Sequence, residues 1–209
     1  MNRRNYQKEL DQILEAQKGK EKKKLFLHCC CAPCSSYVLE YLHSYFDITV
    51  FFFNPNITEE EEYEKRKKEL LRFIKKAPFG ASISIADADY CSERFLEGAK
   101  GHEHDPERGP RCEMCFRLRL EETGKRAKEG GFDLFCTTLS ISPHKDAELL
   151  MKVGEELAAR FGVSYLPSDF KKKNGYKRSI ELSREYHLYR QDYCGCRFSR
   201  EAKEREEWT

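Results

Sequence analysis

Five short apolar segments recur along the chain, and helical patterns separate them. They read KLFLHC, ITVFFFNP, GASISIADA, FDLFCTTLSIS and VSYLP, at 24–29, 48–55, 80–88, 132–142 and 163–167. Near-continuous apolar runs between helices are typical of strands that are buried on both faces of a parallel sheet. The pattern therefore predicts an α/β fold with a mostly parallel sheet.

Two of the intervening helices carry start and stop signals. The first is predicted to begin at a capping box formed by Thr58 and Glu61. The second is predicted to begin at Ser142 and Pro143 and to end at Gly162. Apolar residues at helical spacing predict the buried faces: Leu70, Leu71 and Ile74 in the first helix, and Leu149, Leu150, Val153, Leu157 and Phe161 in the second.

Two segments break this alternation. Residues 98–115 form a polar Gly/Pro loop that runs into a helix, and the part from Ser168 onward combines a basic stretch, a helical pattern and the sequence YCGC. Residues 1–23 read as a polar N-terminal arm, so we expect a single α/β domain over 24–209 with a Cys-bearing helical C-terminal part. Irregular segments that carry cysteine are where we expect function.

Length and composition limit the role of the cysteines. A chain of 209 residues can fold around its own core without disulfides or a metal. The N-terminal segment has no apolar stretch, and no later segment approaches a membrane span, so we expect a soluble, cytoplasmic protein with no membrane partner. In a reducing cytosol, ten cysteines are more typical of metal ligands or redox groups than of disulfides.

Eight of the ten cysteines fall into three tight groups: Cys29, Cys30, Cys31 and Cys34; Cys112 and Cys115; Cys194 and Cys196. The first group directly follows the first predicted strand, where an open parallel sheet binds its ligands. Pro33 suits the first turn of the next helix, and a helix N-terminus lowers the pKa of a thiol. The alternative is a buried run of small apolar side chains.

The other two groups have spacings that suit a shared metal. At the start of a helix, C-x-x-C places Cys112 and Cys115 on one face. Half of a zinc site and a thioredoxin-like redox pair are the alternatives, although a redox pair normally follows a strand directly. In the C-G-C sequence, Gly195 lets both thiols point the same way. The isolated Cys91 and Cys136 read as packing residues.

Eight thiols exceed the four ligands of one zinc ion, which indicates two metal centres or an iron–sulfur cluster. Cys30 and Cys31 together with Cys112 and Cys115 would supply the four thiolates of a 4Fe-4S cluster. The residues left for a second metal are Cys34, Cys194, Cys196 and Asp89.

A basic stretch lies near the C-terminal cysteines. Net charge is only +2, but 38 basic and 36 acidic residues still allow a local basic face. The sequence KKKNGYKR at 171–178 could bind phosphates, or it could be a solvated loop. Four tyrosines follow or fall within it and could stack on bases: Tyr176, Tyr186, Tyr189 and Tyr193.

Three motifs in this order, HCCCAPCSSYVLE, ERGPRCEMCFRLRLEET and RSIELSREYHLYRQDYCGC, resemble those of the QueH-type epoxyqueuosine reductases over about residues 24–200. The resemblance implies a Rossmann-like fold related to the PP-loop and adenine-nucleotide hydrolase-like proteins. In those proteins a Ser/Gly-rich phosphate loop follows the first strand. HCCCAPCSS occupies that place here, so we do not expect ATP chemistry.

The resemblance also implies an activity, namely the last step of queuosine synthesis. An epoxide on the modified wobble base of tRNA is reduced to an alkene, without cobalamin, by an enzyme with a 4Fe-4S cluster and a neighbouring metal, which we expect to be iron. Such an oxidoreductase needs tRNA carrying epoxyqueuosine and an electron donor that the sequence does not identify. A single metal-binding catalytic domain over 24–209 would hold the site.

By similarity, the family's C-C-x-P-C falls on Cys30, Cys31 and Cys34, which leaves Cys29 as an addition and a lesser candidate ligand. The chemistry requires a proton donor, for which the candidates are Tyr193, Glu185 and Asp192. The candidate tRNA contacts are the basic residues of the stretch: Lys171, Lys172, Lys173, Lys177 and Arg178.

Two other functions compete with this one. A PP-loop-like tRNA sulfur-transfer enzyme would use cysteines as persulfide carriers, but it should need ATP and a glycine-rich phosphate loop. A zinc-binding nucleic-acid module would use paired thiols, but eight clustered thiols exceed a structural zinc site. Iron with sulfide would favour the reductase, whereas zinc alone would favour the module.

Overall fold

A computed structural model describes residues 4–207, and its centre is a five-stranded sheet. The strands are β1 (Lys23–His28), β2 (Phe46–Phe51), β3 (Ile83–Ala86), β4 (Leu134–Thr137) and β5 (Ser164–Tyr165). All neighbouring strands pair in parallel, in the order β3-β2-β1-β4-β5. The prediction of an α/β fold with a parallel sheet is therefore confirmed.

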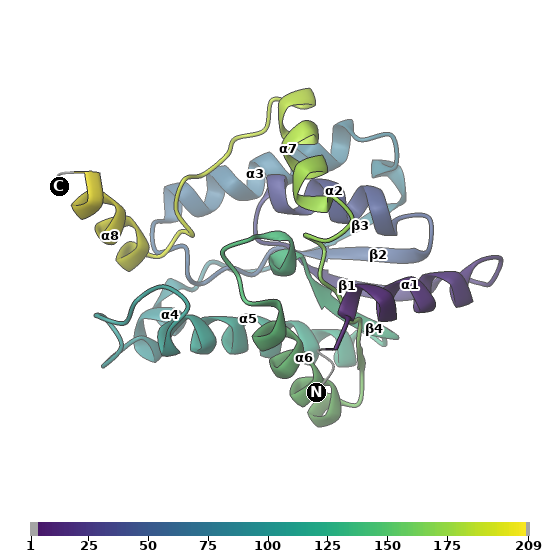
Figure 1. The fold of residues 1–209 in the computed structure, drawn as a ribbon, viewed down its shortest axis with the longest axis horizontal. Coiled ribbons are helices and arrows are strands. Elements are labelled where there is room, and N and C mark those ends of the chain that lie inside the picture. Colours follow the sequence, from purple (N-terminus) through teal and green to yellow (C-terminus); the bar gives the residue numbers. More distant parts are fainter. Residues whose placement is uncertain (1–3, 208–209) are drawn as a thin grey trace.

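Helices cover both faces of the sheet. They are α1 (Tyr6–Gln17), α2 (Ala32–Leu42), α3 (Glu60–Lys76), α4 (Ser92–Gly98), α5 (Pro110–Glu129), α6 (Ala147–Phe161), α7 (Gly175–Glu185) and α8 (Arg197–Glu207), with short 3-10 turns η1 (Gly80–Ser82) and η2 (Thr138–Ile141). Figure 1 shows α2, α3 and α7 on one side of the sheet and α5 and α6 on the other. No helix in residues 4–207 is long and apolar enough to cross a membrane.

The two layers explain why the strand sequences are almost continuously apolar. Along β1, Leu25 and Leu27 are buried in one hydrophobic cluster with α2 and α3, whereas Phe26 is buried in the other, with α5 and α6. Successive side chains of a strand point to opposite faces, so a strand between two helical layers needs apolar residues at every position. This burial is the main force that holds the sheet.

The capping-box prediction for α3 is wrong. The helix begins at Glu60 after Glu59, and no side chain caps it. Thr58 instead donates its backbone N–H to the carbonyl of Gly195 at 3.2 Å. A contact with the C-terminal segment therefore fixes the chain before α3, which a local sequence pattern does not show.

The predicted start of α6 is also wrong, by about one turn. The helix begins at Ala147, and the carboxylate of Asp146 accepts the backbone N–H groups of Glu148 and Leu149. The Asp146 carboxylate thus satisfies two N–H groups of the first turn, while Ser142 Oγ accepts the N–H of His144 in the turn before the helix. The predicted end is confirmed, because Gly162 adopts a left-handed conformation with φ +67°.

The N-terminal arm contributes to the main fold. Residues 6–17 form α1, whose Leu10 and Leu14 are buried in the same hydrophobic cluster as α2 and α3. Asn5 caps the helix by accepting the backbone N–H of Lys8. A domain boundary between residues 23 and 24 stays a prediction.

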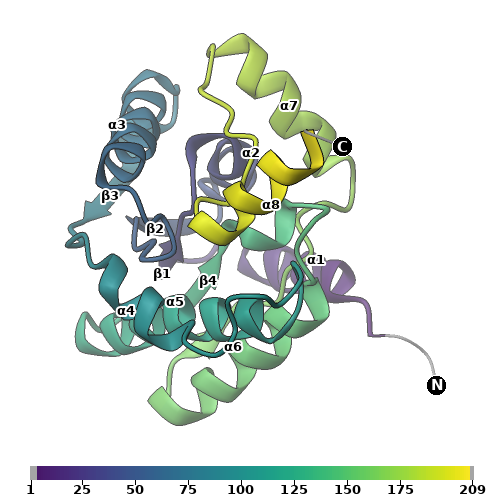
Figure 2. The same cartoon turned by 90° about the vertical axis from the view of Figure 1, so that its left-hand side faces the viewer.

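The strand order reverses between β1 and β4, so two carboxyl ends diverge there into α2 and η2. Open α/β sheets bind their ligands at such a point. Figure 2 views the molecule from the left of Figure 1 and shows α8 between the layer of α3 and α7 and the layer of α4 and α5. The C-terminal helix therefore covers part of the space beyond the strand ends.

Candidate metal and redox site

Three thiols meet where β1 leads into α2. The strand ends at His28, and α2 begins at Ala32 with Pro33 in its first turn, as predicted. The sulfur atoms of Cys30, Cys31 and Cys34 lie within 4.8 Å of one another, which is close enough to share a metal ion.

Cys29 lies apart from these three thiols. Its backbone N–H donates to the Phe51 carbonyl at 2.9 Å and so continues the sheet, and its side chain is fully buried in a hydrophobic cluster. Burial raises the pKa of the Cys29 thiol well above its ordinary value. Cys136 is likewise fully buried, on β4, which confirms it as a packing residue.

Within the group, Cys30 is the residue whose pKa is lowered. The thiols of Cys31 and Cys34 donate hydrogen bonds to it and lower its pKa well below the ordinary value, against the effect of burial. The same interaction raises the pKa of Cys31 to about 12 and also raises that of Cys34. One sulfur anion with two thiol donors is an arrangement that a thiophilic metal can replace by binding all three sulfurs.

Cysteines of all three sequence groups line one cavity of about 640 Å³: Cys30, Cys34, Cys112, Cys115, Cys194 and Cys196. The cavity lies beyond the carboxyl ends of β1 and β4 and is lined by residues of α2, α5, η2, α7 and α8. Segments that are at least 78 positions apart in sequence, as Cys34 and Cys112 are, thus supply thiols to one space.

The C-x-x-C pair starts α5, as predicted. Pro110 is the first residue of the helix, and Cys112 and Cys115 follow within its first two turns. The Cys112 sulfur accepts the backbone N–H of Arg108 at 3.3 Å. Burial raises the pKa of the Cys115 thiol, although the nearby guanidinium of Arg119 opposes this effect.

The C-G-C segment lies between α7 and α8. The sulfur atoms of Cys194 and Cys196 are 3.5 Å apart, and Gly195 has φ +108°, which an L residue rarely adopts. The contact with the Cys196 side chain lowers the pKa of Cys194, burial opposes this effect, and the charge of Lys145 lowers the pKa further. This segment therefore adds two sulfur atoms to the cavity.

Hydrogen bonds from the α3 side hold this segment in place. Arg66 Nη1 and Asn56 Nδ2 both donate to the carbonyl of Cys194, at 3.2 and 3.1 Å. Arg66 is itself held by Glu62, with Nε 2.7 Å from Oε1. Asn56 also lines the cavity, and its buried Oδ1 has no hydrogen-bond partner in residues 4–207.

Helix α8 closes the cavity from the C-terminal side. Arg200 pairs with Glu59, and Ser199 Oγ donates to Glu107 at 2.5 Å. Phe198 packs on Phe95 of α4 with ring centroids 6.3 Å apart. Because these contacts reach α3, α4 and the loop before α5, the helix joins the two layers over the thiols.

The sequence model of the family described as "Epoxyqueuosine reductase QueH" matches residues 25–202. This range contains all three cysteine groups that line the cavity. The chain belongs to the QueH family of epoxyqueuosine reductases.

Named relatives agree with this assignment over most of their length. The chain is 42% identical to the epoxyqueuosine reductase QueH of Streptococcus pyogenes serotype M1, over 92% of this chain and 76% of the relative. The Staphylococcus epidermidis relative is 43% identical over 93% and 84%. The Thermotoga maritima relative is 33% identical over 84% and 89%.

The candidate acids and the candidate oxygen ligand differ in where they lie. Tyr193 and Asp192 line the cavity, whereas Glu185 is at the far end of α7 and is 4.0 Å from Arg178. Asp89 is exposed and does not line the cavity. Burial raises the pKa of Tyr193. The contact between Asp192 and Lys203 lowers the pKa of Asp192.

Three of the candidate tRNA contacts are engaged by carboxylates. Lys171 pairs with Asp169 at 2.5 Å, Lys173 with Asp11 at 2.7 Å, and Arg178 with Glu40 at 2.6 Å. Lys172 and Lys177 are exposed and have no ion pair within the described part of the chain. The basic stretch thus offers two uncompensated charges on the surface.

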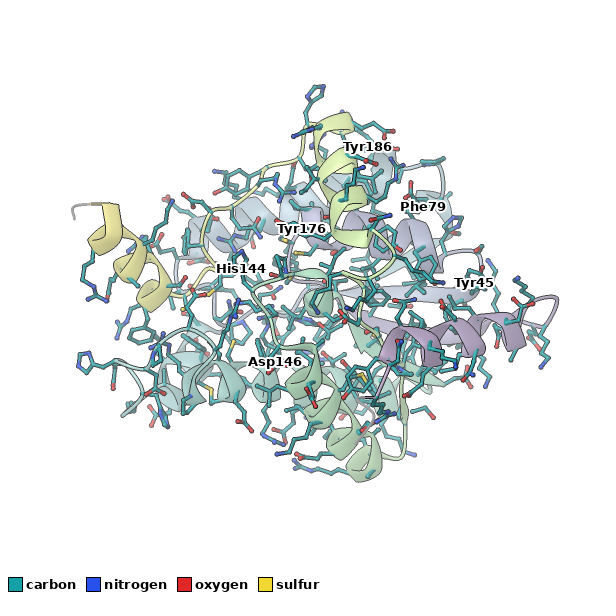
Figure 3. The ribbon with its side chains drawn as sticks, in the orientation of Figure 1. Tyr45, Phe79, His144, Asp146, Tyr176 and Tyr186 are labelled. Carbon is teal, nitrogen blue, oxygen red and sulfur yellow. The ribbon has the colours of Figure 1, made fainter. Side chains whose placement is uncertain are left out.

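Two of the four tyrosines face the site. Tyr176 lines the cavity from the start of α7, opposite His144 from the loop before α6 (Figure 3). Tyr193 lines it from the C-G-C segment. Tyr186, at the other end of α7, packs edge-on against Phe73 with centroids 5.1 Å apart, so its role is structural.

Several charged residues of the cavity escaped the sequence analysis, among them Glu107, Arg119 and Lys145. Burial tends to lower the pKa of Lys145, but its electrostatic interactions with neighbouring side chains, first of all Cys194, raise it overall. A signal existed for Arg119, because it follows Cys115 by four positions and so shares its helix face. Glu107 and Lys145 lie in loops, where spacing predicts no common face.

Proposed function

We propose that the protein removes the epoxide oxygen of epoxyqueuosine in tRNA and so produces queuosine. The observation that carries the proposal is the single cavity lined by thiols from β1, α5 and the α7–α8 loop, in a chain of the epoxyqueuosine reductase family. The reaction takes two electrons and two protons and releases the epoxide oxygen as water, which leaves an alkene. Redox-active metal chemistry is what such a thiol-rich cavity can supply.

The proposed cofactors are a 4Fe-4S cluster and a second metal, iron. Cys30, Cys31, Cys112 and Cys115 would hold the cluster. The residues for the second metal are Cys34, Cys194, Cys196 and a carboxylate. Glu107 lines the cavity and Asp89 does not, so Glu107 takes the place of Asp89 in this proposal.

The donor set supports this assignment. The sulfurs of Cys30, Cys31 and Cys34 lie within 4.8 Å of one another, and the contacts that lower the pKa of Cys30 and Cys194 favour the thiolate state that metals bind. A bound cluster would deliver electrons singly, and a second metal with an open position would act as a Lewis acid on the epoxide oxygen.

For the proton donor we propose Tyr193. Burial raises the pKa of its hydroxyl, which keeps the proton on at neutral pH, and the guanidinium of Arg66 lies 5.1 Å from its ring centroid. Asp192 is an anion because Lys203 lowers its pKa, and Glu185 lies away from the cavity. The Tyr193→Phe variant should therefore lose activity while retaining its iron.

The cavity suits one modified base and not a whole anticodon loop. A volume of about 640 Å³ is within the usual range for a small-molecule site, so the base must leave its stack to enter. Tyr176 at the cavity wall would stack on a base, and Lys172 and Lys177 would contact phosphates outside. Phosphate contacts would position the tRNA, and the cavity would select the base.

The test is an anaerobic reaction of the purified protein with tRNA that contains epoxyqueuosine, with dithionite in place of the cellular electron donor. Mass spectrometry of the digested nucleosides should show queuosine, lighter by one oxygen atom. The Cys136→Ala variant should retain activity and the Cys30→Ala variant should lose it. If epoxyqueuosine stays unchanged with protein that contains its full complement of iron and sulfide, the proposal is contradicted. A sulfur-containing product that requires ATP would indicate the sulfur-transfer enzyme instead.

A further inference from the structure

The α5 wall of the cavity carries two buried arginines, and Arg119 is the one whose guanidinium lies beside a thiol, with 3% of the residue exposed. The other, Arg111, donates to the backbone carbonyls of His102 and Glu103, at 2.9 Å each. Arg119 Nη2 donates to Asn54 Oδ1 at 2.5 Å, and its Nη1 lies 3.8 Å from the Cys115 sulfur. Its Nε lies 3.4 Å from His28 Nε2. An amide, a thiol and an imidazole thus surround this cation.

No carboxylate lies within ion-pair distance of Arg119 in residues 4–207. The imidazole of His28 supplies no counter-charge, since a histidine side chain is either neutral or cationic; its ring nitrogens face the Phe53 carbonyl at 3.0 Å and the Thr137 hydroxyl at 2.8 Å. A buried charge without a counter-charge is costly, and an arginine cannot relieve it by losing a proton. The compensating anion must therefore come from the cavity.

The cavity atoms near Arg119 that can carry negative charge are cysteine sulfurs. Arg119 stands between the C-x-x-C pair, whose Cys115 it contacts, and the end of β1, where Cys30 follows His28 by two positions. Both cysteines are ligands in the proposed cluster. A cluster held by four thiolates carries net negative charge, and each electron that it accepts adds one more.

We propose that Arg119 is the buried counter-charge of the iron–sulfur cluster and sets its reduction potential. The inference rests on the cofactor assignment of the proposed function. A cation fixed in a medium of low polarity favours the form of the cluster with more negative charge, which is the reduced form. Arg119 is a positioning residue in this account, because it acts through the cluster and contacts no reacting atom of the substrate.

A structural role alone would make a different prediction. If Arg119 served only to hold Asn54 and the end of β1, a neutral side chain of similar length would disturb folding or cluster content but not the potential of the clusters that form. The charge role predicts a shift that follows the charge and not the shape of the side chain. Reduction potential is therefore the readout that separates the two.

The first comparison uses Arg119→Gln and Arg119→Lys, prepared without air and titrated with dithionite and redox mediators while the cluster spectrum is recorded. In the Gln variant we expect the reduction equilibrium to shift at least about tenfold toward the oxidised cluster, about 59 mV for one electron. The Lys variant keeps the charge and should recover most of the wild-type value. The control Arg117→Gln lies on the same helix, is exposed and pairs with Glu156 at 2.8 Å, and should behave as wild type.

A second variant cancels the charge and leaves Arg119 in place. Asn54→Asp puts a carboxylate where the amide oxygen now lies 2.5 Å from Nη2, so it should shift the equilibrium in the same direction as Arg119→Gln. This variant decides the question if Arg119→Gln assembles no cluster. Wild-type potential in cluster-loaded Arg119→Gln or Asn54→Asp protein would overturn the inference. Wild-type protein without iron and sulfide would instead overturn the cofactor assignment on which it rests.

Discussion

Two buried arginines stand in opposite walls of the cavity and differ in their partners. Arg66 on α3 is 2% exposed and pairs with Glu62 at 2.7 Å, whereas Arg119 on α5 is 3% exposed and has no carboxylate partner in the described residues. The two side chains are almost equally buried, so they differ in their ion-pair and hydrogen-bond partners. One charge is neutralised within the protein, and the other is left for whatever occupies the cavity.

The difference indicates that the α3 wall and the α5 wall of the cavity have different roles. On the α3 side, a neutralised Arg66 uses its remaining N–H groups to hold the backbone of the C-G-C segment, including the Cys194 carbonyl at 3.2 Å. On the α5 side, Arg119 directs its charge toward thiols. The α3 wall therefore fixes geometry, and the α5 wall supplies electrostatics.

The largest expected effect comes from removing a thiol on the α5 side. Cys115→Ala should reduce bound iron and sulfide to less than about a tenth of the wild-type content, because a cubane cluster needs four ligands. Iron and sulfide analysis of anaerobically prepared protein measures this. Cys136→Ala, which removes a buried thiol of β4 outside the cavity, should keep both; equal contents in the two variants would break the comparison.

The two arginines should respond oppositely in metal-free protein. Arg66→Gln removes the ion-pair partner of the mostly buried Glu62 carboxylate and one of the two side-chain donors to the Cys194 carbonyl, and should cost about 3 kcal/mol of unfolding free energy. Arg119→Gln removes an uncompensated charge and should change the same quantity by less than about 1 kcal/mol. Urea unfolding of both variants measures the difference. A loss in Arg119→Gln as large as that in Arg66→Gln would show that Arg119 is structural.

The next effect sharpens the role of the α3 wall. Gly195→Ala adds a Cβ at φ +108° that would lie 2.8 Å from Ile57 Cγ1, and should cost about 2 kcal/mol. Gly101→Ala is the matched control, because Gly101 also has positive φ but no heavy atom within 4 Å of the added Cβ. It should cost about 1 kcal/mol. If the unfolding midpoints fall equally in both variants, backbone strain at positive φ and not the tight fit beside α3 accounts for the cost at Gly195.

The last effect is pH-dependent and concerns His28 beside Arg119. Burial, helped by the charge of Arg119, lowers the pKa of His28 from 6.5 to about 3. The unfolded chain therefore binds a proton below pH 6.5 that the folded protein refuses, so this stability is present above pH 6.5 and is lost as pH falls toward 3. The loss should be about 1.4 kcal/mol per pH unit in this window. His28→Asn should abolish this part of the pH dependence of unfolding; an unchanged slope would contradict it.

The sequence could predict what depends on local pattern. The five strands, the start of the C-x-x-C helix and the left-handed Gly162 all follow from apolar periodicity and single-residue preferences. The capping of α3 could not be predicted, because Thr58 is held by Gly195, which is distant in sequence. Local pattern also could not choose the helix start at Asp146 over Ser142, because Asp and Ser are about equally good N-cap residues.

The same distinction applies to the site: local pattern predicts some of its features, and tertiary packing decides the others. Motif spacing could identify the cysteines, since chemistry selects residue type and local geometry. It could not assign Cys29 to the hydrophobic core, because adjacent cysteines differ only in which face of the strand end they occupy. Nor could it find Glu107 in the cavity or place Asp89 outside it, since tertiary packing of loops decides both.

Metal content tests the central claim most directly. Protein purified without air should contain about four sulfides and four or five irons per chain, and an absorption band near 400 nm should bleach with dithionite. This result would support a cluster at Cys30, Cys31, Cys112 and Cys115. Stoichiometric zinc without sulfide in the same preparation would contradict the account and would favour a zinc-binding nucleic-acid module.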